Sequence, residues 1–170
     1  MIRRQTLVLL ALTAVLTAAA SGQSLPQVSL KADALSPRSI EPLTETNIAR
    51  DYAIAWKDLS QALEQNRTDL LNEQFTGFAH DRLKERVADQ QRIGLRTQIV
   101  DHGHKLKAIF YSLDGGAMQL LDEAQIQIQI FDGSRLIDTQ DASQKYIVLM
   151  TPGADRWYVR SMESAPTSKP

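Results

Sequence analysis

The segment Gln125–Ile130 alternates strictly between glutamine and isoleucine. In an extended chain successive side chains point to opposite faces, so every Ile lies on one face and every Gln on the other. A helix would distribute both residue types around its axis. The segment therefore predicts a β-strand, and its Ile face requires another layer of the protein to pack against.

Apolar residues upstream have the spacing of a helix. Those between Ile48 and Leu63 recur every three or four positions and form one stripe. Thr44 or Thr46 could cap the start of this helix, and Asn66 is a plausible end. Three charged residues fall outside the stripe and are expected on its polar face: Asp51, Lys57 and Glu64.

Two shorter helical patterns follow. One covers residues 69–75, with Thr68 as its N-cap, and the other covers residues 78–92. Gly94 suits the left-handed position that often ends a helix. The region from 46 to 92 is therefore predicted to supply three helices.

Beyond Gly94 the hydrophobic period changes from 3.6 to 2. Strands are predicted at residues 96–112, 123–131, 145–151 and 157–162. Asp-Gly pairs at 114–115 and 132–133 are strong hairpin signals, because the turns between paired strands need positive φ. The predicted fold class is α+β, with the N-terminal helices packed on one face of a four-stranded, curved antiparallel meander sheet.

The first 22 residues have the pattern of a secretory signal peptide. Arg3 and Arg4 precede a stretch of mostly apolar residues at 7–20, and small residues follow it. A helix that spans a membrane needs about 20 apolar residues, which is longer than this stretch. The pattern predicts cleavage and export to a periplasmic or extracellular location, with an uncleaved membrane anchor as the alternative.

The remaining chain divides into three parts. Residues 23–42 contain three prolines and are predicted to be a linker. Residues 43–163 form the folded domain, and residues 164–170, rich in Ser, Thr and Pro, form a disordered tail.

Composition excludes several functional classes. The formal net charge is -1, and no long basic cluster occurs, which argues against a nucleic-acid partner. The chain has no cysteine, so it has no disulfides, thiolate catalysis or zinc–thiolate site. No phosphate-binding loop or nucleophile elbow is present. No cofactor is expected.

Two of the three histidines lie close together, in the segment Asp101–His104. In a regular strand His102 and His104 share an apolar face, where either could act as a general base. Asp101 points the other way and could orient a neighbour only if Gly103 forms a bulge. A metal site would need a third ligand, and only His80 remains, so none is predicted. Alternatively, both histidines are polar residues at the end of a strand.

Three aromatic residues could line a cavity between helix and sheet: Tyr52, Trp56 and Tyr111. The competing interpretation places them in the core or at its edge. The row formed by Gln125, Gln127 and Gln129 is either solvated surface or the contact face of a homodimer, since amides can bond across an interface without the desolvation cost of charges.

The layout resembles the nuclear-transport-factor-2-like superfamily of α+β rolls, which includes polyketide cyclases and ketosteroid isomerases. The similarity rests on the helix segment Tyr52–Trp56, the Asp114-Gly115 hairpin and the closing segment Asp155–Val159. The resemblance implies a fold but no function, because these folds serve both enzymes and inert adaptors. No isomerase or cyclase pair of catalytic residues can be matched.

Three hypotheses follow. The first is an exported, non-enzymatic domain that binds a small apolar ligand or a partner protein, with a homodimer formed through the sheet. The second is a cofactor-free isomerase or cyclase with His102 or His104 as base. The third is an envelope-anchored secretion or assembly accessory, which touches the membrane only if the signal peptide is uncleaved.

Overall fold

The computed structural model describes residues 24–33 and 35–166, so the predicted signal peptide at 1–22 lies outside the described residues. Within these residues there are two α-helices, α1 (Pro42–Gln65) and α2 (Gly77–Arg92), with a 3₁₀ turn, η1 (Thr68–Leu71), between them. The strands are β1 (Val28–Lys31), β2 (Leu95–Tyr111), β3 (Met118–Asp132), β4 (Arg135–Pro152) and β5 (Trp157–Ser164).

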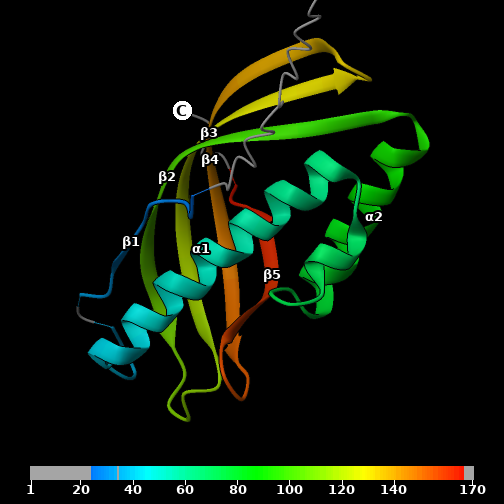
Figure 1. Ribbon diagram of the computed structural model, residues 1–170. Coiled ribbons are helices and arrows are strands. Elements are labelled where there is room, and N and C mark those ends of the chain that lie inside the picture. The colour runs from blue at the N-terminus through cyan, green and yellow to red at the C-terminus, as the bar shows by residue number, and fades with distance from the viewer. Residues whose placement is uncertain (1–23, 34, 167–170) are drawn as a thin grey trace, which may run out of the picture.

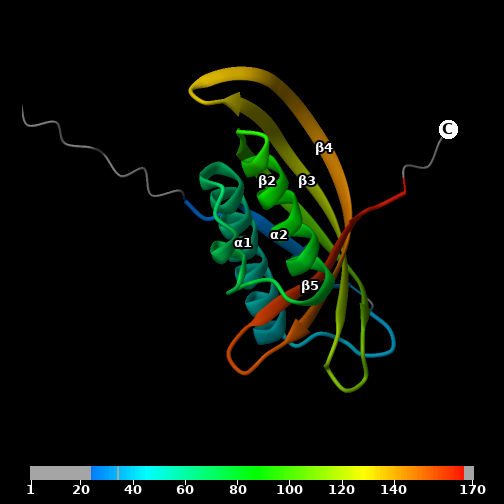
Figure 2. The same cartoon turned by 90° about the vertical axis from the view of Figure 1, so that its right-hand side faces the viewer.

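The strands form one sheet in the order β1-β2-β3-β4-β5, in which β1 runs parallel to β2 and all other pairs are antiparallel. Both helices cover the same face of the sheet, and β3 and β4 curve around that face (Figures 1 and 2). The predicted α+β class and its one-sided arrangement of helices are confirmed. The predicted number of four strands is one too few.

The additional strand, β1, lies within residues 23–42, which the sequence predicts to be a linker. Val28–Lys31 pair in register with the residues from His104 to Lys107. The backbone N–H of His104 also donates to the carbonyl oxygen of Gln27, at 2.9 Å. Four residues are too few for periodicity to reveal a strand, and this one is stabilised by the exposed edge of β2.

Helix α1 begins earlier than predicted, at a proline of the expected linker. Pro42 occupies the first helical turn, where its fixed φ is favourable and its missing N–H costs nothing. Thr44 and Thr46 therefore lie inside the helix and do not cap it; the Thr46 hydroxyl donates to the Pro42 carbonyl, at 2.9 Å. Asn66 ends the helix in the left-handed conformation, as predicted.

The predicted second helix at 69–75 is reduced to η1. Beyond η1 the backbone pairs with β5: the N–H of Val159 donates to the Gln74 carbonyl, and the N–H of Thr76 donates to the Val159 carbonyl. The N–H of Phe75 keeps a helical bond to the Leu71 carbonyl, at 3.2 Å, but the sheet-like bonds of Gln74 and Thr76 prevent a continuous helix over residues 69–75. The third predicted helix, at 78–92, is confirmed as α2.

Strand β4 is longer than predicted because its first half lacks the period-two alternation of a half-buried strand: Leu136 and Ile137 are adjacent, and polar residues follow them. Residues 135–141 are exposed, yet they pair with β3 around the Asp132-Gly133 turn. At the other end, β5 continues to Ser164, and the N–H of Ala165 donates to the Lys145 carbonyl, at 2.7 Å. The start of the predicted disordered tail therefore belongs to the sheet, and residues 167–170 lie outside the described part.

The core lies between α1 and the inner face of the sheet. Ile126 is buried there, whereas Ile128 and Ile130 are half-buried towards the open end of the curve. The glutamines of the same strand lie on the opposite face, as predicted. Their amides bond within the sheet, Gln125 to Ser143 and Gln127 to Asp141, each at 2.8 Å.

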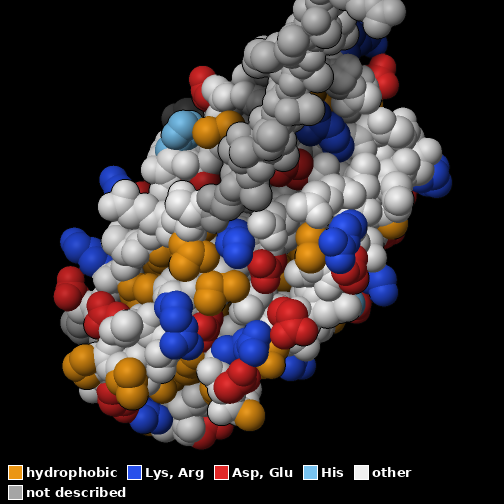
Figure 3. Space-filling view, viewed as in Figure 1, with side chains coloured by type: hydrophobic (Ala, Val, Ile, Leu, Met, Phe, Trp, Pro, Cys, Tyr) orange, Lys and Arg blue, Asp and Glu red, His pale blue; other side chains and the backbone are white. Residues whose placement is uncertain are grey.

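Acidic and basic side chains are intermingled on the face that carries α1 (Figure 3). In the described part of the chain, no helix is both long and apolar enough to cross a membrane.

Candidate functional site

A bulge in β2 separates the two neighbouring histidines. The register with β3 shifts between Asp101 and Gly103, and Gly103 has φ = 121°, a conformation that favours glycine. His102 is consequently exposed, whereas His104 lies on the inner face of the sheet and is buried. The bulge also turns the Asp101 side chain towards His104.

His104 is the centre of what is called here the buried cluster, which comprises the buried residues Tyr52, His104 and Asp122 and the half-buried Asp101. The imidazole bonds through Nδ1 to Oδ2 of Asp122, at 2.9 Å, and through Nε2 to Oδ2 of Asp101, at 2.8 Å. The Tyr52 hydroxyl donates to the same oxygen of Asp122, at 2.8 Å. The cluster therefore joins α1, β2 and β3 across the core.

The two carboxylates determine the charge of His104. Burial alone would lower the pKa of the imidazole, but the hydrogen bonds and negative charges of Asp101 and Asp122 outweigh it and raise the pKa to about 9. Burial raises the pKa of the Tyr52 hydroxyl well above its usual value, and the charge of Asp122 adds to this effect. At neutral pH the cluster therefore holds an imidazolium between two carboxylates, with Tyr52 as a neutral donor.

This arrangement limits the chemistry of His104. Both ring nitrogens carry protons and donate them, so neither offers the lone pair that a general base or a metal ligand needs. Among the described residues, no group of three or more His, Asp or Glu side chains could hold a metal ion. Within the same residues, Oδ1 of Asp122 and the indole N–H of Trp56 are buried without a hydrogen-bond partner.

Trp56 separates the buried cluster from an open cleft. Its ring packs on His104, with centroids 4.4 Å apart, and meets Tyr146 at 5.8 Å. The cleft, about 510 Å³ in volume, lies between α2 and the inner face of the sheet. Its floor carries apolar and aromatic side chains, whereas its rim is polar, so that polar atoms make up somewhat more of the lining surface than apolar atoms do. The apolar and aromatic residues are Trp56, Leu59, Leu83, Ile99, Ile126, Ile128, Tyr146 and Met162, and the polar ones are Arg82, Arg86, Glu163 and Ser164.

The other candidates from the sequence lie apart from one another. His102 is exposed and lines a smaller pocket of about 340 Å³, together with Trp56 and Asp101. Tyr111 is buried elsewhere, 6.4 Å from Trp157 between ring centroids and with the Arg38 guanidinium 5.0 Å from its ring centroid. Of the three predicted aromatic residues, Trp56 lines the cleft, whereas Tyr52 belongs to the buried cluster and Tyr111 to neither.

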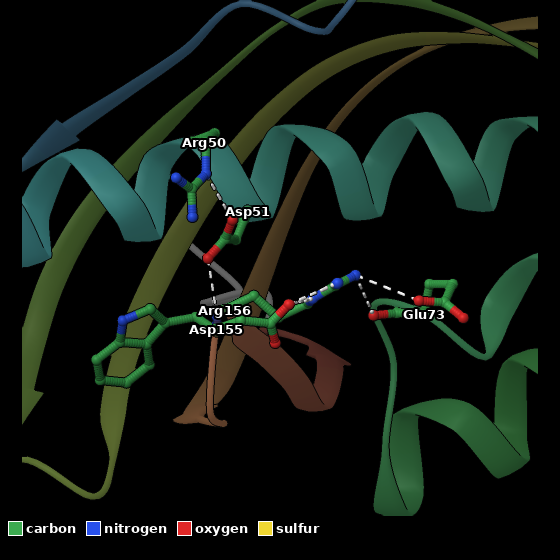
Figure 4. Close-up of polar contacts among 6 residues, drawn as sticks. Arg50, Asp51, Glu73, Asp155 and Arg156 are labelled. Carbon is green, nitrogen blue, oxygen red and sulfur yellow. Dashed lines mark hydrogen bonds and ion pairs between the residues drawn. The ribbon is translucent and has the colours of Figure 1, made fainter.

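A second polar group, around Asp51, fastens α1 to the turn before β5 (Figure 4). Although its position in the sequence predicts an exposed residue, Asp51 is buried. Its carboxylate accepts the backbone N–H of Trp157 and the Arg50 guanidinium, each at 2.8 Å. Nearby, Arg156 pairs with Asp155 and Glu73. The contacts of Asp51 with Trp157 and of Arg156 with Glu73 link distant parts of the chain, so we assign the group a structural role.

Sequence reasoning missed Asp122, Arg86 and Tyr146. Asp122 carried a usable signal: in β3 it lies in phase with Leu120 and Ala124, so a carboxylate had to face the core. Arg86 and Tyr146 carried none, because a charged residue on a helix and a tyrosine in a strand are ordinary. Their proximity depends on how α2 lies over the sheet.

No protein-family model matches the chain, and no curated protein matches it. Solved structures do resemble it. The intermembrane space region of the chloroplast protein ARC6 is 16% identical, and the likeness covers 77% of this chain and 100% of that one, with a TM-score of 0.63.

Two bacterial structures are also similar. The Kfla4162 protein from Kribbella flavida is 11% identical over 72% of this chain and 92% of that one, with a TM-score of 0.51. ActVI-ORFA from Streptomyces coelicolor is 12% identical over 73% and 98%, with a TM-score of 0.50. At such identities the likeness concerns the fold alone, and it agrees with the α+β fold expected from the sequence.

Proposed function

We propose that the protein is an exported, non-enzymatic binding domain that holds a small apolar ligand in the cleft between α2 and the sheet. The observation that carries this proposal is the cleft itself, which is open to solvent yet has an apolar floor. Ligand pockets typically have volumes of about 300–1,000 Å³, with apolar walls and a few polar groups.

The engagement of His104 supports a binding role over catalysis by this histidine. His104 is shielded from the cleft by Trp56 and engaged at both nitrogens. Ile128, by contrast, is half-buried on the cleft floor and leaves apolar surface for a ligand. Covering such surface is favourable by roughly 25 cal/mol per Å².

The uncharged fluorescent dye N-phenyl-1-naphthylamine tests this function. We expect its emission to rise on binding to the purified domain. The variant Ile128→Trp should weaken binding at least about fivefold, because the larger ring occupies the floor of the cleft.

The control is Gln127→Trp, the same enlargement at the adjacent position on the opposite face of β3. It should bind the dye like the wild type. If the dye does not bind, or if both variants weaken it equally, the cleft is not the binding site.

Export is a separate part of the proposal, and it rests on the sequence of the first 22 residues. Mass spectrometry of the protein purified from its native cells should find a mature N-terminus at Ser21 or Gln23. An intact Met1 would favour the anchored alternative.

The homodimer predicted from the glutamine row remains a prediction. Light scattering after size exclusion measures it directly, and a monomer at high concentration would contradict it. Because Gln125 and Gln127 already bond to Ser143 and Asp141, a second copy would have to compete with these contacts.

A further inference from the structure

Two polar side chains in the cleft have unused hydrogen-bonding capacity. Arg86, on α2, has no ion-pair or hydrogen-bond partner among the described residues. The hydroxyl of Tyr146, on β4, likewise bonds to none of them, although the residue is half-buried. Both line the cleft, and no contact within the described fold accounts for either donor.

These two donors line the same cleft and interact electrostatically. Burial raises the pKa of the Tyr146 hydroxyl, the positive charge of Arg86 lowers it, and the buried charge of Asp122 raises it by a smaller amount, so Arg86 and Tyr146 lie within electrostatic range of each other. The net shift is upward, which keeps the phenol protonated and able to donate at neutral pH. A guanidinium and a neutral hydroxyl together suit an oxygen anion.

The other charges around the cleft do not cancel Arg86. Glu163, on β5, also lines the cleft, and its carboxylate is 4.0 Å from the Arg82 guanidinium, so the charges of Glu163 and Arg82 largely offset each other. On α2 itself, Asp89 pairs with Arg92 at 3.0 Å, and Glu85 lies further along the groove between α2 and β2. Arg86 is therefore the charge left for a ligand.

We propose that the ligand of this cleft is an anionic amphiphile, whose carboxylate is bound by Arg86 and Tyr146 and whose apolar chain lies over Ile126 and Ile128. This inference rests on the proposed binding function and adds the chemistry of the head group. The apolar floor continues beyond Ile128 to Ile130, which lines the adjoining part of the same groove below α2. A chain longer than the cleft can follow that floor.

Displacement of N-phenyl-1-naphthylamine by three ten-carbon compounds tests the head group: decanoate, decanol and decylammonium, each below its micelle concentration. We expect decanoate to bind about tenfold more tightly than decanol, because its carboxylate forms charge-assisted hydrogen bonds that the hydroxyl of decanol cannot form. Decylammonium should bind most weakly, because Arg86 repels it.

Two variants locate the head group. Arg86→Gln should remove the advantage of decanoate over decanol, and Tyr146→Phe should reduce it about fivefold, since Phe deletes one donor and keeps the ring. Matched controls lie outside the cleft: Lys84→Gln on the exposed side of α2 and Tyr158→Phe on β5 should change nothing.

The outcomes separate this inference from the binding function. If the dye binds but decanoate and decanol displace it equally, or if Arg86→Gln keeps the preference, the head-group assignment is wrong and the apolar site stands. If decylammonium binds best, the assignment is also wrong. If the dye does not bind to the wild type at all, the binding function fails and the inference falls with it.

Discussion

Two sets of polar side chains lie on opposite sides of Trp56, and they differ in how fully they are used. In the buried cluster, both nitrogens of His104 and the hydroxyl of Tyr52 are bonded within the fold. In the cleft, Arg86 and Tyr146 have no such partner among the described residues. Side chains whose hydrogen bonds are made within the fold, as in the buried cluster, stabilise the protein. Side chains without such partners, as in the cleft, are available to a ligand. We therefore assign the binding function to Arg86 and Tyr146 and not to the histidine and carboxylates of the buried cluster.

The largest effect is expected at the centre of the buried cluster. Asp122→Ala leaves an imidazolium and the Tyr52 hydroxyl without their shared acceptor, and breaking such a buried pair costs about 3–5 kcal/mol. Urea denaturation should show a much lower midpoint. The control is Glu123→Ala at the next position, where the carboxylate is exposed and paired with Lys145.

A midpoint for Asp122→Ala close to that of Glu123→Ala would contradict the structural role of the cluster. The buried cluster would then not be a stabilising element, and His104 would again be a candidate base.

The stability of the domain should fall as pH rises from 6.5 to 9. The folded-state pKa of His104 is about 9, above the ordinary value of 6.5, so the folded state holds this proton more tightly than the unfolded state. Its contribution is fully present below pH 6.5 and is lost as pH passes through 9. Linkage gives a total of about 3 kcal/mol.

Urea titrations at half-unit pH intervals measure this slope, and His104→Gln should remove it. Stability that is constant or rises over the same interval in the wild type would show that the imidazole is not held as a cation.

The group around Asp51 is a second set of polar side chains whose hydrogen bonds are made within the fold. Asp51→Ala leaves the buried backbone N–H of Trp157 without its acceptor, which costs about 1–3 kcal/mol. Thermal unfolding measures the loss. Asp155→Ala removes a neighbouring exposed carboxylate and should have little effect; equal losses for the two variants would assign the stabilisation to surface charge instead.

The smallest change in stability is expected in the cleft. Tyr146→Phe should shift the free energy of unfolding by less than about 1 kcal/mol, because its hydroxyl bonds to no described residue. Calorimetry without ligand measures this. A loss as large as that for Asp51→Ala would mean that the hydroxyl has a structural partner, and the cleft would no longer contrast with the buried cluster.

Local patterns in the sequence predict much of this fold. The alternation at Gln125–Ile130 sets the faces of β3, and both Asp-Gly pairs lie at hairpin turns whose glycines have positive φ. The local patterns do not predict strand β1 or the first half of β4. Strand β1 is stabilised by pairing with the edge of β2, and the first half of β4 by backbone pairing with β3 without burial of its side chains.

The site was less predictable because it depends on register and packing. His104 pairs with Ala124, which places Asp122 diagonally beside it on the same face, and no local pattern specifies that register. The sequence did not predict the bulge at Gly103 itself; it indicated only that Asp101 could orient a neighbouring histidine if such a bulge formed. Arg86 and Tyr146 line one cleft only once α2 is packed over the sheet.

Nitrogen-15 NMR of the histidine rings during a decanoate titration, together with the backbone signals, tests most directly whether the ligand binds at the cleft and leaves the buried cluster unchanged. We expect the backbone signals of Arg86, Ile128 and Tyr146 to shift with added decanoate, while both ring nitrogens of His104 stay protonated and their shifts stay constant. A His104 ring that loses a proton, or whose shifts follow the ligand while those of Arg86 do not, would contradict the division into a closed cluster and an open cleft.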